Sequence, residues 1–317
     1  MKDRMMLYGV TLRKRYTKRQ KAYFLEHIGS VYPRYGFPVS AQEKKHRLFS
    51  VCNAVAGDAD RAGTVFVASY DTPTRALLPR YKYYPFHAEK SLQEENWNLL
   101  ARILLAALPA AASFFSFKLY ADAQGAARGM YLFFGAAFAL LTMSAAKVRP
   151  SPVNFNRNSA SLAVLEQIAE SCRGNRNVAF AFLDQSVASY EGLKLFLKRL
   201  KGKPKTIVIL DSVSSGGTLL LAHRGGSAAA AAEKIEKAAR KNGLAVTDRT
   251  YREEKAQKNV LSFSKDMLYL VSGEVEGREF AVNGTRSGKD IRVDIGRMEK
   301  IASTLAEFAG NQEPQKQ

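Results

Sequence analysis

A strand-like segment that ends on a carboxylate is the first place in this sequence where chemistry could occur. Residues 178–183 (VAFAFL) are apolar, Asp184 follows, and an amphipathic segment begins at residue 190. This order is typical of a buried parallel strand that leads through a loop into a helix, the place where α/β proteins bind ligands. The loop residues 185–188 are Gln, Ser, Val and Ala, with no further carboxylate, His or Cys. The segment is therefore either a site that has lost its catalytic residues or a loop that never held any.

The other reactive side chains form no recognisable motif. The chain has four histidines and two cysteines, none in an HExxH or paired CxxC pattern. Both cysteines have apolar neighbours, which predicts core residues in a reducing compartment rather than a disulfide. We expect His223 to be a structural histidine and SSGG (214–217) to be a turn between strands. His87 and Glu89 could supply ligands to a substitute metal site, but an interfacial loop is the preferred interpretation.

Composition favours a folded, strongly basic protein. The 317 residues are 46% hydrophobic and carry a formal net charge of +19. Such a charge favours contact with anionic lipid or nucleic acid. No helix-turn-helix, zinc-finger or RNP pattern is present, so a nucleic-acid partner is not expected. The first residues lack the apolar stretch of a signal peptide, and export through the N-terminus is not expected either.

Two apolar segments in the middle of the chain predict a transmembrane hairpin. Residues 99–117 contain one charge, Arg102, and residues 129–146 contain none. Each approaches the roughly 20 residues that cross a hydrocarbon core of about 30 Å. Lys and Arg are frequent on both outer flanks, which predicts that both flanks are cytoplasmic and lie beside anionic lipid. The alternative is a pair of buried helices in a soluble core.

Helices and strands alternate on either side of this hairpin, which predicts an α/β fold. We expect a three-layer αβα sandwich with a mostly parallel mixed sheet. The hairpin, residues 91–150, would be an insertion between two parts of one domain, residues 1–90 and 151–310, and residues 311–317 would form a disordered tail. The expected helices span residues 19–36, 158–172, 190–200, 227–243 and 295–310; the expected strands span residues 47–57, 63–73, 177–184, 205–211, 217–224, 267–275 and 278–285.

Polar residues follow the expected strands in an order that resembles a known family. VFVASYDTP (65–73), NRNSASLAVLEQIAE (156–170), the segment around residue 186, VILDSVSSGG (208–217) and NGTRSGKD (283–290) occur in that sequence. M28 family zinc aminopeptidases carry their metal-binding motifs in the same order, each beside the same kind of strand or helix. The chain resembles this family from about residue 20 to residue 310 apart from the hairpin, and the resemblance implies the same fold.

The resemblance assigns positions of the family's metal site, most of them with altered residues. Ser69 stands where the family has a His ligand, and Asp71 keeps the Asp two residues later. Arg157 stands at the position of the metal-bridging Asp. Ser186 occupies the position of the general base, and Val187 that of a ligand. Asp211 keeps its ligand position, and the last His would fall near Gly284.

On this alignment only Asp211 remains as a metal ligand, with Asp71 as a possible orienting residue. A two-zinc hydrolase needs His and carboxylate ligands and a base that accepts a proton from the bound water. The Arg157 guanidinium cannot lose its proton, so its charge could replace that of a metal and pair with Asp211 or Asp71. We therefore expect no bound metal and no catalytic residue at this site.

The sequence thus predicts a membrane-anchored, catalytically inactive relative of M28 peptidases with a binding or scaffolding role. Its α/β domain would lie on the cytoplasmic face of the cell membrane, with a peptide or protein as partner. One alternative is an active zinc-dependent aminopeptidase with a divergent ligand set. Another is a soluble α/β binding protein with an internal helical hairpin.

Overall fold

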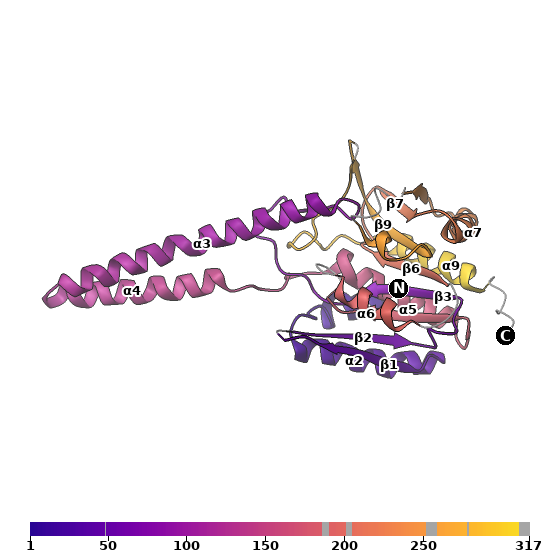
Figure 1. Ribbon diagram of the computed structural model, residues 1–317, viewed down its shortest axis with the longest axis horizontal. Coiled ribbons are helices and arrows are strands. Elements are labelled where there is room, and N and C mark those ends of the chain that lie inside the picture. The colour runs from indigo at the N-terminus through magenta and orange to yellow at the C-terminus, as the bar shows by residue number, and fades with distance from the viewer. Residues whose placement is uncertain (48, 186–189, 201–204, 252–258, 278, 311–317) are drawn as a thin grey trace.

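The computed structural model describes residues 1–47, 49–185, 190–200, 205–251, 259–277 and 279–310. A mixed β-sheet forms the body, and two long helices project from it (Figure 1). The strands follow the order β1-β2-β5-β3-β6-β9-β10-β4, and β7 pairs with β9 and with β8. Their bounds are β1 Val39–Lys45, β2 Ser50–Ala56, β3 Thr64–Ser69, β4 Lys82–Tyr83, β5 Val178–Leu183, β6 Thr206–Asp211, β7 Thr218–His223, β8 Thr247–Thr250, β9 Met267–Glu276 and β10 Glu279–Asn283.

The helices cover both faces of this sheet. Phe66 and Ala68 of β3 pack into a core shared with α2, α5, α7 and α9, whereas Val65 and Val67 face a second core that includes α6. This alternation follows from the two-residue period of a strand buried on both sides. The bounds are α1 Lys2–Met6, α2 Lys18–Val31, α3 Ala88–Asp122, α4 Gly125–Ala146, α5 Ala160–Ser171, α6 Glu191–Arg199, α7 Ser227–Lys241 and α9 Ile295–Gly310, with short turns at Leu7–Thr11, Tyr32–Tyr35, Phe155–Ser159 and Val260–Phe263.

The central strands β5, β3, β6 and β9 are parallel, and antiparallel pairs lie toward the edges. The α/β prediction is confirmed as a mixed sheet with helices on both faces. The strands expected at 47–57 and 63–73 exist as β2 and β3, but β5 lies between them in the sheet. The edge strand β1, whose seven residues all pair with β2, was not predicted, because its sequence is polar and most of its side chains are exposed.

One other local expectation differs from the structure. The helix expected at 158–172 begins as a π-helical turn, Phe155–Ser159, and continues as α5. The Ser159 side chain does not cap this helix; its hydroxyl donates instead to the carbonyl oxygen of Tyr8, at 2.8 Å. The predicted tail, residues 311–317, lies outside the described residues.

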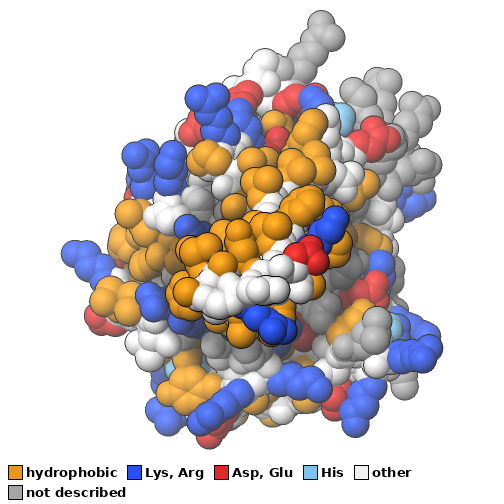
Figure 2. All heavy atoms as spheres, turned by 90° about the vertical axis from the view of Figure 1, so that its left-hand side faces the viewer, with side chains coloured by type: hydrophobic (Ala, Val, Ile, Leu, Met, Phe, Trp, Pro, Cys, Tyr) orange, Lys and Arg blue, Asp and Glu red, His pale blue; other side chains and the backbone are white. Residues whose placement is uncertain are grey.

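Helices α3 and α4 form the hairpin that leaves the body of the protein (Figure 1). By length and composition both are apolar enough to cross a membrane. Their large side chains face outward: Leu108 is 75% exposed and Phe133 is 68% exposed. Small residues form the contact between them, where the Ser113 hydroxyl donates to the Gly135 carbonyl oxygen at 2.9 Å. In the end-on view of Figure 2, hydrophobic side chains gather on this projection, with Lys and Arg spread around it.

Candidate functional site

The parallel strands bring three predicted polar positions to one edge of the sheet. Ser69 ends β3 opposite Leu183 of β5, and Asp211 ends the neighbouring strand β6. Asp71 follows Ser69 by two residues. Ligands of open α/β sheets bind outside the carboxyl ends of such strands. The predicted positions Ser186 and Val187 lie outside the described residues.

Arg157 lies in the π-helical turn before α5 and is 4% exposed. Its Nη1 is 3.2 Å from Asp211 Oδ2, and its guanidinium carbon is 3.7 Å from the centre of the Tyr83 ring. Burial lowers the pKa of Arg157, but the Asp211 carboxylate and the hydroxyls of Tyr83 and Tyr269 outweigh burial and raise it well above its ordinary value. The side chain is therefore a permanent buried cation with one carboxylate partner and a cation–π contact.

Asp211 also accepts hydrogen bonds from neutral donors. The Tyr269 hydroxyl donates to Oδ2 at 2.6 Å, and the Ser212 hydroxyl donates to Oδ1 at 2.9 Å. Burial, followed by the nearby Asp211 carboxylate, raises the pKa of Tyr269 well above its ordinary value, so the phenol keeps its proton. Ser212 has φ +54°, a left-handed conformation that is uncommon for a residue with a Cβ atom. Both oxygens of Asp211 are thus occupied by protein donors.

Asp71 is associated with a different arginine. Arg15 is fully buried and donates from Nη1 to the Tyr8 carbonyl oxygen at 2.9 Å and from Nη2 to the Ser159 hydroxyl at 3.1 Å. Burial lowers the pKa of Arg15 to about 10, although the Asp71 carboxylate opposes this shift. The structure therefore pairs Arg157 with Asp211, while Arg15 supplies a second buried cation near Asp71. Nothing in the sequence pattern indicated Arg15.

Asp184, the carboxylate after β5, has a structural environment. It is 1% exposed, forms an ion pair with Lys21 of α2, and accepts the backbone N–H of Cys52 at 3.2 Å. Its own N–H donates to Asn53 Oδ1 at 3.0 Å. These contacts tie α2 and β2 to the end of β5. Asp184 thus stabilises the sheet edge.

The other sequence candidates also have protein partners. His223 Nε2 lies 3.1 Å from Asp248, and His87 Nε2 lies 3.1 Å from Glu279. In the SSGG turn, the N–H groups of Ser214 and Ser215 both donate to Asn156 Oδ1, at 2.9 and 3.1 Å. These donors hold the turn against the start of α5. His223 and the SSGG turn have the structural surroundings that we expected.

Gly284 follows β10 with φ +76° and lines a pocket of about 600 Å³ next to the carboxyl-terminal sheet edge. Ser215 of the SSGG turn and Asp290 also line this pocket. Four cations surround this opening, Arg80 and Lys82 from one segment and Lys289 and Arg292 from another. Sequence reasoning did not identify them, because the two segments lie far apart in the sequence.

Asp290 belongs to the segment NGTRSGKD and is 4% exposed. Its Oδ1 accepts the backbone N–H of Asn156 at 2.9 Å. Burial raises the pKa of Asp290 to about 7, although the backbone donors of residues 156 and 157 and the charge of Arg157 oppose the shift. A carboxyl group with such a pKa exchanges its proton near neutral pH. Asp290 is the titratable group of this pocket that the alignment did not assign.

We predict that Asp290→Asn stabilises the protein at alkaline pH. Between about pH 4 and pH 7 the folded carboxyl holds a proton that the unfolded chain has lost, so stability falls as pH rises. Above this range the buried, ionised carboxylate continues to lower the free energy of unfolding. The variant should match the wild type near pH 4 and exceed it near pH 8 by about 1 kcal/mol or more.

Urea unfolding at several pH values measures this difference, and Glu233→Gln on the exposed face of α7 is the matched control. The control should leave the pH dependence unchanged. A constant difference between Asp290→Asn and the wild type at all pH values would contradict the assigned titration.

The described residues do not fit a zinc ion at this sheet edge. Zinc sites need three or four His, Cys or carboxylate ligands. Within the described ranges no group of three or more His, Cys, Asp or Glu side chains is arranged to hold a metal. A guanidinium stands against Asp211, whose two oxygens already accept hydrogen bonds. The vestigial role assigned to Ser69, Asp71, Arg157, Val187, Asp211 and Gly284 stays a prediction.

Comparison with protein-family models and with curated proteins finds no match. Among solved structures, the glutaminyl cyclase of Bacteroides thetaiotaomicron aligns with a TM-score of 0.58 at 13% identity, over 98% of this chain and 95% of that chain. A Zn-dependent exopeptidase from Parabacteroides distasonis aligns with a TM-score of 0.54 at 13% identity, over 98% and 95%. The LapA aminopeptidase of Legionella pneumophila aligns with a TM-score of 0.51 at 8% identity, over 100% and 70%. The chain therefore has the fold that these cyclases and zinc-dependent peptidases share.

Proposed function

We propose that this chain is a membrane-anchored binding protein built on the zinc-exopeptidase fold, without zinc-dependent peptidase activity. The observation that carries this proposal is the buried ion pair of Arg157 with Asp211. On the alignment with M28 peptidases, this pair occupies the position of a metal-bridging carboxylate and a metal ligand. A cation at that position repels a second cation, so the pair replaces the charge that a metal would supply.

The pocket beside this ion pair would be the binding site. Its exposed basic side chains, Arg80, Lys289 and Arg292, favour a ligand with an anionic group, and a peptide with a free carboxylate has this chemistry. Ser215 adds a neutral polar group to the pocket wall. The geometry thus supports recognition of a peptide or protein terminus without a reaction on it.

The hairpin α3–α4 would supply the membrane anchor. Its exterior is formed by large apolar side chains and its interior contact by small residues. This is the reverse of a soluble helical hairpin, where the large side chains would be buried, and it is the packing that membrane helices use. Lys and Arg on both flanks support a cytoplasmic position for the α/β body.

A metal and activity measurement on the purified full-length chain tests the absence of peptidase chemistry. After incubation with zinc and removal of the excess, we expect far less than one zinc per chain. We also expect no chelator-sensitive turnover of aminoacyl or N-terminal glutaminyl substrates. The Zn-dependent exopeptidase of Parabacteroides distasonis, treated in the same way, is the positive control. Stoichiometric zinc together with chelator-sensitive turnover would favour the active-enzyme alternative and contradict this proposal.

A further inference from the structure

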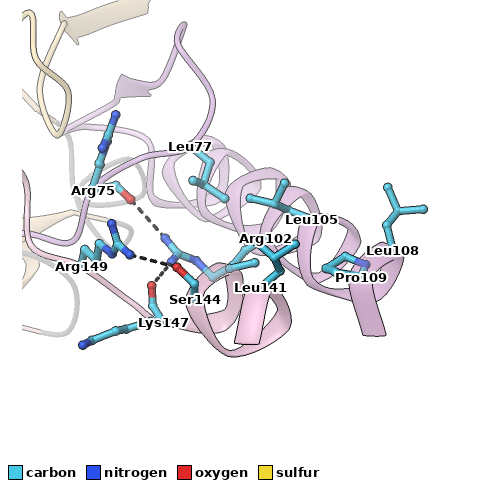
Figure 3. Close-up of a pocket in the computed structure, with 11 residues that line it drawn as sticks. Arg75, Leu77, Arg102, Leu105, Leu108, Pro109, Leu141, Ser144, Lys147 and Arg149 are labelled. Carbon is cyan, nitrogen blue, oxygen red and sulfur yellow. Dashed lines mark hydrogen bonds between the residues drawn. The ribbon is translucent and has the colours of Figure 1, made fainter. Parts of the chain in front are cut away.

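A second pocket, of about 520 Å³, lies at the base of the hairpin, away from the sheet-edge site. One part of its wall is apolar and comes from the hairpin, with Leu105 and Leu108 on α3 and Leu141 on α4. The other part is basic. It is formed by Arg75, Arg102, Lys147 and Arg149. In Figure 3 these basic side chains lie toward the body of the protein, whereas the leucines lie along the hairpin.

The backbone holds the basic part of the pocket in place. The Arg75 N–H donates to the Arg149 carbonyl oxygen at 2.8 Å, and Thr74 forms a β-bridge with Pro150. The chain segments that enter and leave the hairpin are therefore joined at its base. The Arg102 guanidinium donates to the carbonyl oxygens of Lys147 and Arg75, each at 3.2 Å (Figure 3). Arg102 thus acts as a clamp between these two segments.

The remaining three cations present their charge to the solvent. Arg75, Lys147 and Arg149 are exposed, and the Arg149 guanidinium donates to the neutral Ser144 hydroxyl at 3.1 Å. None of the described residues that line the pocket is acidic. A phosphate group at this position would meet several positive side chains without a competing carboxylate.

We propose that this pocket binds one anionic phospholipid. The phosphate of the headgroup contacts Arg75, Lys147 and Arg149, and an acyl chain lies along the leucines of the hairpin. The inference rests on the proposed membrane anchoring, because the pocket opens at the level where the apolar segments end. The apolar wall favours a lipid over free phosphate, since inorganic phosphate would leave it uncovered.

Lipid retention by the full-length chain tests this site. The protein is reconstituted in vesicles that mix phosphatidylcholine with a minor fraction of phosphatidylglycerol, and lipids that remain bound after detergent extraction are counted by native mass spectrometry. Wild type should retain one phosphatidylglycerol in preference to phosphatidylcholine. In the double variant Arg75→Gln/Arg149→Gln, the preference for phosphatidylglycerol over phosphatidylcholine should fall roughly tenfold or more. Each Lys or Arg near a membrane surface contributes to the binding free energy of an anionic lipid, and this variant removes two of them.

The matched control removes the same charge at the other end of the hairpin, with Lys118→Gln/Arg128→Gln, and should keep the wild-type preference. An excess of inorganic phosphate should not displace the retained lipid. Equal retention of both lipids by the wild type, equal losses in both double variants, or displacement by inorganic phosphate would overturn the lipid site while anchoring stands. Failure of the wild type to float with these mixed vesicles would instead contradict the membrane anchor itself.

Discussion

Arg157→Met is expected to lower the free energy of unfolding by about 3–5 kcal/mol. The substitution removes the cation 3.2 Å from Asp211 and the cation–π contact with the Tyr83 ring. Asp211 would then hold its charge with the hydroxyls of Tyr269 and Ser212 as neutral donors. A partly buried carboxylate that loses its cation bears a desolvation cost that neutral hydrogen bonds offset only in part.

Three further variants separate charge from shape at this position. Arg157→Lys keeps the charge but loses the planar stacking on Tyr83, so an intermediate loss is expected. Arg157→Asp should be the least stable, because it places a second carboxylate beside Asp211. The double variant Arg157→Met/Asp211→Asn removes both charges and should recover part of the loss of Arg157→Met.

Thermal and urea unfolding measure these differences, with Lys237→Met on the exposed face of α7 as the control. The control should stay within about 0.5 kcal/mol of wild type. If Arg157→Met unfolds together with wild type, the ion pair does not stabilise the sheet edge. The idea that a guanidinium has replaced the charge of a metal would then be wrong.

A cysteine placed at Gln124 is expected to react with a membrane-impermeant maleimide in intact cells, whereas one at Lys237 should react only after permeabilisation. Gln124 lies between α3 and α4 and is exposed, and Lys237 lies on the α/β body. This result follows if residues 99–146 cross the membrane twice and both basic flanks remain inside. The expected difference is close to all or none, because the bilayer separates the two positions.

The native cysteines interfere little with this measurement. Burial raises the pKa of the Cys172 thiol to about 11, and burial also raises the pKa of Cys52, so both form little reactive thiolate at neutral pH. A Cys52→Ser background removes the more accessible of the two. Absence of labelling at Gln124 before permeabilisation, or release of the protein by alkaline carbonate, would favour the soluble alternative and contradict the topology. Labelling of both positions without permeabilisation would also contradict it, because the α/β body would then lie outside.

The sequence by itself determined the elements whose patterns are local. The helix at 295–310 agrees with α9, and the strands expected around residues 178, 206 and 267 agree with β5, β6 and β9. Each buries a continuous or periodic set of apolar residues, so its own composition identifies it. The two apolar helices are equally local, since length and hydropathy alone define them. The carboxylates at strand ends were also visible, because a charge that ends an apolar run marks the edge of a sheet.

Only the tertiary structure decided which of these groups meet. The position of β5 between β2 and β3 depends on pairing between residues more than 100 positions apart, which no local pattern encodes. The polar edge strand β1 buries little apolar area and so leaves almost no signal in the sequence.

The same reason applies to the site. Asp211 meets Arg157 and Tyr269 because strands β6 and β9 and the turn Phe155–Ser159 converge at one sheet edge. Asp290 has a raised pKa because it is buried in the folded chain. Burial and charge pairing are properties of the assembled surroundings. The sequence determined the residue types, and the fold determined their electrostatic partners.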